Sequence, residues 1–172
     1  MHQLYYPLKL YFSHVDFLRT LLQRASMHWK IITVGKPALP WARAALEDYL
    51  KRLKRAVRIE HIIVKDGPRD QVENLLLHAS ADSLRVVLDE RGKSRRSKEL
   101  ARWIQDHELH GTKRVSLIIG GADGHSESFR EAANECWTLS SFTLQHEIAL
   151  VVLAEQIYRA YSIIRGEPYH RE

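Results

Sequence analysis

The chain has 172 residues, of which 45% are hydrophobic and 27% charged, and this composition is typical of a single globular domain and excludes wholesale disorder. Its single cysteine, Cys136, excludes a framework of disulfide bonds and suits a reducing, cytoplasmic compartment. Because 26 Lys and Arg outnumber 21 Asp and Glu, the formal net charge is +5, which favours a polyanionic partner.

No segment is expected to enter a membrane. The most apolar stretch, residues 148–164, is interrupted by Glu155, Gln156, Arg159 and Ser162 and is shorter than the roughly 20 residues that cross a bilayer. Residues 1–26 lack the basic start, the continuous apolar run and the small-residue cleavage site of a signal peptide. We therefore expect a soluble protein.

Regular patterning begins at Met27 and alternates strand with helix. Short apolar runs bounded by turn residues predict five strands, at residues 29–34, 59–64, 84–88, 115–119 and 137–140. Helical periodicity and start signals predict helices at residues 40–54, 70–78, 97–110, 126–135 and 147–165. Asp70 and Glu73 have the spacing of a capping box, Ser126 has the position of an N-cap, and residues 91–96 are expected to form a basic loop.

This order predicts an α/β fold with a mostly parallel sheet of five to six strands and helices on both faces, because the strands are continuous apolar runs. Ligands of such sheets bind at the carboxyl ends of strands. The segments after Leu88, Ile119 and Ser140 are therefore expected to carry the chemistry. Residues 1–26 do not fit this pattern, and they are either an N-terminal extension or the product of an upstream start, with Met27 as the true first residue.

The strongest local signal is the run Gly-Gly-Ala-Asp-Gly at residues 120–124, directly after the fourth predicted strand. Glycines let the backbone approach a ligand closely, although a tight turn explains the run equally well. The run is not GxGxxG, and the chain has neither the acidic residue of a dinucleotide site nor a Walker lysine motif. Residues 140–146 offer hydroxyls and backbone groups of the kind that hold an adenosine-like ligand, or they form an ordinary capped loop.

Basic residues gather in two places. A run of charges is usually a solvated face. The first group, at a predicted helix end, is either such a face or a partial complement to the helix C-terminus, and the second, after the third strand, is either such a face or a contact for a phosphate backbone. The groups are Lys51, Arg52, Lys54, Arg55 and Arg58, and Arg91, Lys93, Arg95, Arg96 and Lys98. His107 and His110 form HxxH rather than HExxH, so we expect no metal site.

The last predicted helix is apolar around almost its whole circumference. This pattern predicts burial on nearly all sides and, in so small a chain, a homodimer interface. Glu155 and Arg159 have i,i+4 spacing and are expected to pair. The tail that follows contains Tyr169, His170 and Arg171, a combination suited to stacking on a base and handling its proton.

Taken in order, several segments resemble the RlmH family, small SPOUT-class methyltransferases that act on large-subunit ribosomal RNA. The resemblance covers residues 27–172 and rests on ordered matches: Lys30-Ile31 leading to Val34-Gly35-Lys36, LDERGK at 88–93, IIGGADG at 118–124, the segment from Leu139 to His146, EQIYRA at 155–160 and PYHRE at 168–172. This ordered set is more specific than the glycine run alone.

The resemblance implies that residues 27–172 form a SPOUT methyltransferase domain, with a C-terminal segment threaded into a trefoil knot, and that the protein is a homodimer. It also implies that S-adenosylmethionine binds to residues from three loops: Leu88, Gly120, Gly121, Leu139, Ser140, Ser141, Phe142, Thr143 and Leu144. The implied substrate is a pseudouridine in a hairpin loop of 23S rRNA in the assembled ribosome, methylated at N3.

The resemblance also gives the tail a catalytic interpretation. N3 of the base carries a proton that must leave before the nitrogen attacks a methyl group, so His170 is expected to act as base or hydrogen-bond partner, with Tyr169 and Arg171 positioning the base and a phosphate. The chain departs from many family members at Gln145, where they have proline, and at Leu150, where they have arginine. The second departure removes one candidate contact to RNA.

Two other classes of function remain open at this stage. A ribosome-associated factor without catalytic activity would bind RNA but no cofactor. A nucleotide-dependent oxidoreductase shares the fold class, but the sequence lacks the dinucleotide fingerprint.

Overall fold

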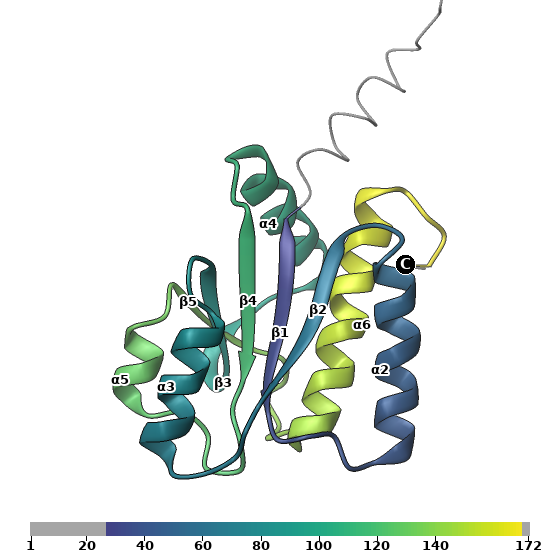
Figure 1. Ribbon diagram of the computed structural model, residues 1–172. Helices are drawn as coiled ribbons and strands as arrows, with labels where there is room; N and C mark the ends of the chain where they lie inside the picture. Colours follow the sequence, from purple (N-terminus) through teal and green to yellow (C-terminus); the bar gives the residue numbers. More distant parts are fainter. Residues whose placement is uncertain (1–26, 170–172) are drawn as a thin grey trace, which may run out of the picture.

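The computed structural model describes residues 27–169, which form one five-stranded sheet with helices on both faces (Figure 1). The strands are β1 (His28–Val34), β2 (Arg58–Val64), β3 (Leu84–Ser94), β4 (Arg114–Ile119) and β5 (Glu135–Thr138). The helices are α2 (Pro40–Leu53), α3 (Arg69–Ala79), α4 (Ser97–Leu109), α5 (Glu127–Glu131) and α6 (His146–Ile164). None of these helices is long and apolar enough to cross a membrane.

All strand pairs are parallel, and the strand order is β2-β1-β4-β3-β5. The predicted α/β class with a parallel sheet is confirmed. The prediction succeeds because parallel strands are buried on both faces and therefore appear in the sequence as unbroken apolar runs.

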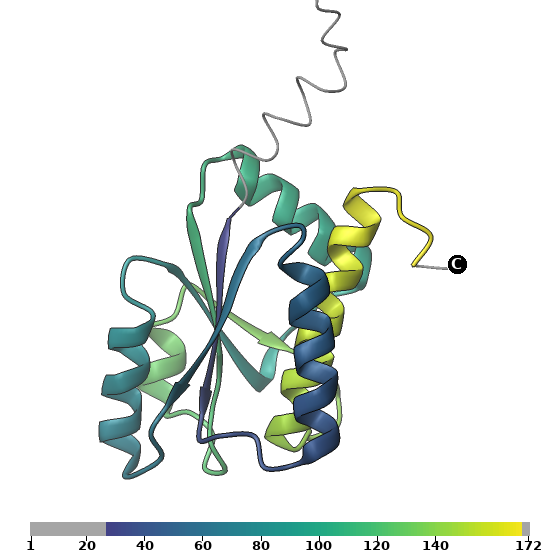
Figure 2. The same ribbon diagram turned by 45° about the vertical axis from the view of Figure 1, so that its right-hand side comes forward.

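Two hydrophobic clusters fill the spaces between the sheet and its helices, and alternate residues of each strand enter one or the other. In β1, Trp29 and Ile31 belong to the cluster beneath α2, α4 and α6, whereas Ile32 and Val34 belong to the cluster beneath α3 and α5. Figure 2 shows these two helical layers on opposite sides of the sheet.

Three local predictions are wrong. Glu73 does not close a capping box, because α3 begins at Arg69 rather than after Asp70. The Glu73 carboxylate instead accepts hydrogen bonds from the backbone nitrogen and the Oγ of Ser126, at 2.7 and 2.8 Å. The predicted helix at 126–135 ends at Glu131, since the chain enters β5 at Glu135. The predicted N-cap at Ser126 is confirmed, with Oγ accepting from the Phe129 backbone nitrogen.

The third correction concerns the segment expected to be a basic loop, because residues 91–94 extend β3. Leu88 and Lys93 both pair with Trp137, so the four residues between them bulge out of the ladder. A side chain at Gly92 would lie 2.3 Å from the carbonyl carbon of Trp137, so the close return of the strand requires glycine here. The bulge carries Asp89, Glu90 and Arg91 to the carboxyl edge of the sheet.

Helix α6 packs against both α2 and α4. Its Leu153, Ala154 and Ile157 are almost completely buried, and Ile148 in its first turn is 39% exposed. The predicted pair is present, since Nη2 of Arg159 lies 2.6 Å from Oε1 of Glu155.

Candidate functional site

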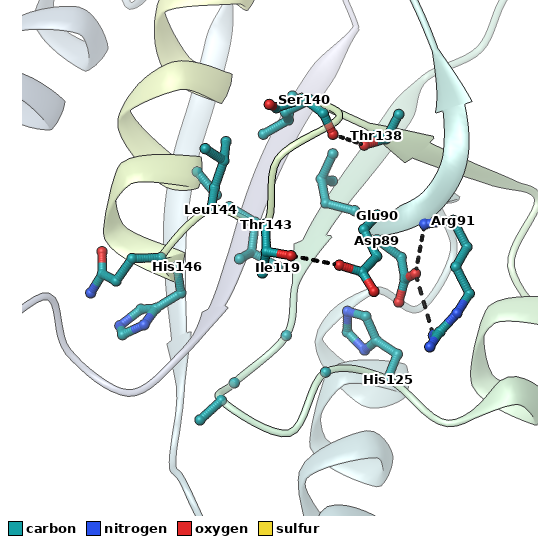
Figure 3. A pocket seen from close by; sticks show the side chains of 18 of the residues that line it. Asp89, Glu90, Arg91, Ile119, His125, Thr138, Ser140, Thr143, Leu144 and His146 are labelled. Atoms are coloured by element: carbon teal, nitrogen blue, oxygen red, sulfur yellow. Dashed lines mark hydrogen bonds and ion pairs between the residues drawn. The ribbon is translucent and has the colours of Figure 1, made fainter.

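The segments that follow β3, β4 and β5 enclose a cavity of about 490 Å³ at the carboxyl edge of the sheet. It is lined by residues 88–91, 119–125, 138–140 and 142–146 and by Ala149. These are the three segments that the sequence predicted to carry the chemistry, and Figure 3 shows side chains from all of them facing one space.

Eight of the nine residues expected to bind a cofactor line this cavity: Leu88, Gly120, Gly121, Leu139, Ser140, Phe142, Thr143 and Leu144. Ser141, the ninth, is an exposed residue of the same β5–α6 segment and does not line it. The fold therefore brings together residues that are more than 50 positions apart in the sequence.

Acidic residues from the β3 bulge form one wall, a feature that the sequence analysis missed. Asp89 has a side chain only 8% exposed, and its Oδ2 lies 3.6 Å from Nη1 of Arg130. Its Oδ1 accepts a hydrogen bond from the Arg91 backbone nitrogen at 3.0 Å. Oγ1 of Thr143 donates to Oε2 of Glu90 at 2.9 Å, which ties the β5–α6 segment to the bulge (Figure 3).

The glycine run forms the floor of the cavity and packs against His125, also missed in the sequence. A Cβ at Gly120 would lie 3.0 Å from Nε2 of His125, so the ring can approach the backbone only because this residue is glycine. The ring is 6% exposed and stacks on Phe129 with centroids 5.0 Å apart. Burial lowers the pKa of His125 below its usual value, although Asp89 acts in the opposite direction.

The β5–α6 segment is held by its own hydrogen bonds. Oγ1 of Thr138 donates to the Ser140 carbonyl at 2.7 Å, and Oγ of Ser140 accepts from the Phe142 backbone nitrogen at 2.9 Å. The Phe142 side chain is 79% exposed at the rim of the cavity. Gln145, one of the two departures from the family pattern, caps α6 by accepting from the backbone nitrogens of residues 147 and 148.

Glu147 fixes the start of α6 to the segment between β1 and α2. Its Oε1 and Oε2 accept hydrogen bonds from the backbone nitrogens of Ala38 and Leu39, each at 2.9 Å. Burial raises the pKa of Glu147, but these backbone donors outweigh that effect and hold the pKa below its usual value. Leu150, the second departure, is 2% exposed and belongs to the hydrophobic core.

Tyr169 lies outside the cavity lining, because the chain folds back after α6 and places this side chain against the middle of the helix. Its hydroxyl is 3.2 Å from that of Tyr49 and donates to Oε1 of Glu155 at 3.1 Å, while its ring packs edge-on against Tyr158. Glu155 is nine residues beyond His146, which lines the cavity, so this contact lies about 14 Å along α6 from the cavity. His170 and Arg171, the other expected tail residues, lie outside the described residues.

The second basic group divides between different environments. Arg91 is 65% exposed at the cavity rim, and Lys93 and Arg96 are exposed nearby. Arg95 instead pairs with Glu135 and stacks over the Trp137 ring, 4.9 Å from its centroid. Within residues 27–169, no group of three or more His, Cys, Asp or Glu side chains is arranged to hold a metal ion.

Comparison with known proteins places this geometry in context. The sequence model of a family described as "Predicted SPOUT methyltransferase" matches residues 27–170. Two proteins named "Ribosomal RNA large subunit methyltransferase H" are similar to this chain over 145 residues. The protein from Deinococcus radiodurans is 37% identical and the protein from Thermus thermophilus is 41% identical. Each alignment covers 84% of this chain and 99% of the relative.

Solved structures show a similar fold at much lower identity. The crystal structure of a "Probable Methyltransferase" from Bordetella pertussis Tohama I aligns with a TM-score of 0.55 and 14% identity, covering 82% of this chain and 98% of that one. A structure described as a "probable methylase family protein" from Haemophilus influenzae Rd KW20 aligns with a TM-score of 0.53 and 8% identity, covering 85% and 71%.

Proposed function

We propose that this chain, which belongs to the SPOUT methyltransferase family, transfers a methyl group from S-adenosylmethionine to N3 of a pseudouridine in 23S rRNA of the assembled ribosome. Its identity of 37% and 41% to two ribosomal RNA large subunit methyltransferases H supports this proposal. Membership of this family sets aside the oxidoreductase alternative. The observation that carries the proposal is the cavity at the carboxyl edge, where three separate loops converge.

The residues of the cavity are compatible with this cofactor. Its volume of about 490 Å³ falls in the usual range for small-molecule sites. Gly120 and Gly121 leave the backbone accessible on one side, and Leu88, Leu139 and Leu144 offer apolar surface on the other. When bound, S-adenosylmethionine supplies a sulfonium methyl group, which is already electrophilic.

The chain itself has to position the base and receive its proton. We assign proton acceptance from N3 to His170, with Tyr169 and Arg171 orienting the base and a phosphate. Tyr169 does not line the cavity of its own chain and contacts Glu155, about 14 Å along α6 from His146. We expect the tail to act on the cavity of a second copy, which makes the homodimer part of the mechanism.

Exposed apolar side chains at the cavity end support such a dimer. Trp41 in the first turn of α2 is 53% exposed, Phe142 is 79% exposed and Ile148 is 39% exposed. Large apolar groups exposed near one another favour contact with a partner. The trefoil knot, in which the β5–α6 segment passes through a loop of the chain, remains part of the same proposal.

RNA would approach along the β3 extension. Among the exposed basic residues, Arg91 lines the cavity and Lys93 lies on this extension, whereas Arg96 precedes α4. These side chains can contact phosphates while the base reaches the methyl group. A ribosomal substrate places the enzyme with the ribosomes, in the cytoplasm.

Titration of the full chain with S-adenosylmethionine tests the assigned site. The substitution Gly120→Val puts atoms against His125 and into the cavity and should abolish binding, whereas Gly67→Val, at an open loop position, should bind like the unaltered chain. Equal binding by both variants would contradict the assignment. Separately, His170→Ala should keep cofactor affinity and lose turnover; weakened binding with normal turnover would refute its role as base.

A further inference from the structure

His125 contributes a buried ring nitrogen that has no hydrogen-bond partner. The side chain lines the cavity and is 6% exposed, and Nε2 is among the buried polar atoms of the described residues that make no hydrogen bond. Buried polar atoms nearly always have a partner, because an unpaired one has lost its hydration without replacement. The unpaired Nε2 therefore indicates a hydrogen-bond partner that is supplied by a ligand in the cavity.

The glycine run covers this nitrogen on the cavity side. An added Cβ at Gly120 would lie 3.0 Å from Nε2 and 3.3 Å from the carbonyl carbon of Gly124. Gly124 has a φ of +63°, which few other residues adopt easily. Because Nε2 is buried, its exposure to a ligand requires this glycine-rich backbone to move.

The charged groups that face the ring already have partners of their own. Asp89 on β3 lies within 3.6 Å of Arg130, and Nη1 of Arg130 on α5 donates to the carbonyl of His125 itself at 2.6 Å. Glu73 on α3 accepts two hydrogen bonds from Ser126. None of the three is hydrogen-bonded to Nε2.

We propose, resting on the function assigned above, that His125 binds the cofactor: Nε2 accepts a hydrogen bond from an N–H or O–H group of S-adenosylmethionine once the backbone at residues 120–124 has moved. Donors of this kind are the ribose hydroxyls and the adenine amino group in the adenosine part, and the ammonium group in the methionine part. Figure 3 shows the His125 ring on the side of the cavity that also carries Asp89, whose charge acts on the ring.

Accepting a hydrogen bond requires a neutral ring. Burial and, to a smaller extent, Arg130 lower the pKa of His125, against the opposing influence of Asp89, Glu73 and a hydrogen bond to the Ile118 backbone. The ring is therefore neutral near pH 7 and becomes protonated only in more acidic solution. Protonation converts Nε2 from an acceptor into a donor, so the affinity for the cofactor should fall as the pH falls.

The test compares full-length variants by calorimetric titration with S-adenosylhomocysteine between pH 8 and pH 5.5. His125→Leu should weaken binding on the order of tenfold at pH 8, which corresponds to one hydrogen bond, and should flatten the pH dependence. His125→Gln retains an acceptor oxygen and should recover part of the affinity. His78→Leu, at an exposed position in the last turn of α3, is the matched control and should behave as the unaltered chain.

A second ligand distinguishes the two parts of the cofactor. If the donor lies in the adenosine part, His125→Leu weakens binding of 5′-methylthioadenosine as well; if the ammonium is the donor, only S-adenosylhomocysteine is affected. In the unaltered chain, the ¹⁵N resonance of Nε2 should shift on binding of each ligand whose affinity depends on His125. This measurement does not depend on the folding of a variant.

The proposal is overturned if His125→Leu has a lower melting temperature but keeps both the affinity and the pH dependence of the unaltered chain, because the ring would then be a structural element only. An unchanged Nε2 resonance on ligand binding would overturn it as well. If the unaltered chain binds neither ligand at any pH, the failure lies with the proposed function itself.

Discussion

Substitution of Gly92 by alanine tests how the β3 bulge is built. The added Cβ would lie 2.3, 2.6 and 2.7 Å from the carbonyl carbon, nitrogen and Cα of Trp137, whereas carbon atoms normally approach to about 3.5–4.0 Å. The obstructing atoms are backbone, so no rotamer change relieves the contact. Either β5 separates from β3 or the bulge opens.

The expected cost is at the upper end of the range for overpacking, about 3 kcal/mol. With a urea slope of about 2 kcal/mol per molar, the unfolding midpoint should fall by about 1.5 M. Gly67→Ala is the matched control, because nothing lies within 4 Å of its added Cβ, and its midpoint should stay the same or rise slightly.

Urea unfolding followed by tryptophan fluorescence measures both variants, and titration with S-adenosylhomocysteine follows the cavity. Since the bulge lines the cavity, Gly92→Ala should also lose ligand affinity under conditions where it remains folded. Equal midpoints for Gly92→Ala and Gly67→Ala would refute the described pairing of β3 with β5.

Three further substitutions test contacts around the cavity and in the core. Because the pKa of Glu147 is lowered on folding, the stability that Glu147→Gln removes should be fully present above the unfolded pKa. It should be lost progressively as the pH falls through the lower pKa of the folded state, in thermal unfolding followed from pH 7 into acid. Thr143→Val removes the hydrogen bond to Glu90 and should weaken cofactor binding several-fold in a titration, with little change in melting temperature. Tyr161→Phe leaves the Trp29 indole nitrogen without its buried acceptor and should cost about 2 kcal/mol in urea unfolding.

Much of the fold was predictable, because buried parallel strands and amphipathic helices leave strong local patterns. The extension of β3 was not, since the residues beyond Leu88 are mostly charged and the strand resumes its pairing with β5 only at Lys93, after an irregular segment. Glu73 shows a related limit: its spacing from Asp70 matched a local cap, but its partner is Ser126, 53 residues away. Local patterns do not reveal which distant segment competes for a side chain.

The candidate site was predicted in outline by the rule that ligands bind at carboxyl ends of strands, and the three predicted segments do meet. Individual side chains were harder to predict. His125 is a single histidine after a glycine run, and only the three-dimensional structure reveals its burial and its unpaired Nε2. Asp89 and Glu90 were overlooked because the neighbouring basic residues dominated the local charge.

Transfer of a labelled methyl group from S-adenosylmethionine to ribosomes that lack the modification tests the central claim most directly, with naked 23S rRNA as the control substrate. The account predicts label at N3 of one pseudouridine, on assembled ribosomes only. Absence of label together with intact cofactor binding would point to another RNA target or to a factor without catalytic activity. Absence of both label and cofactor binding would contradict the account.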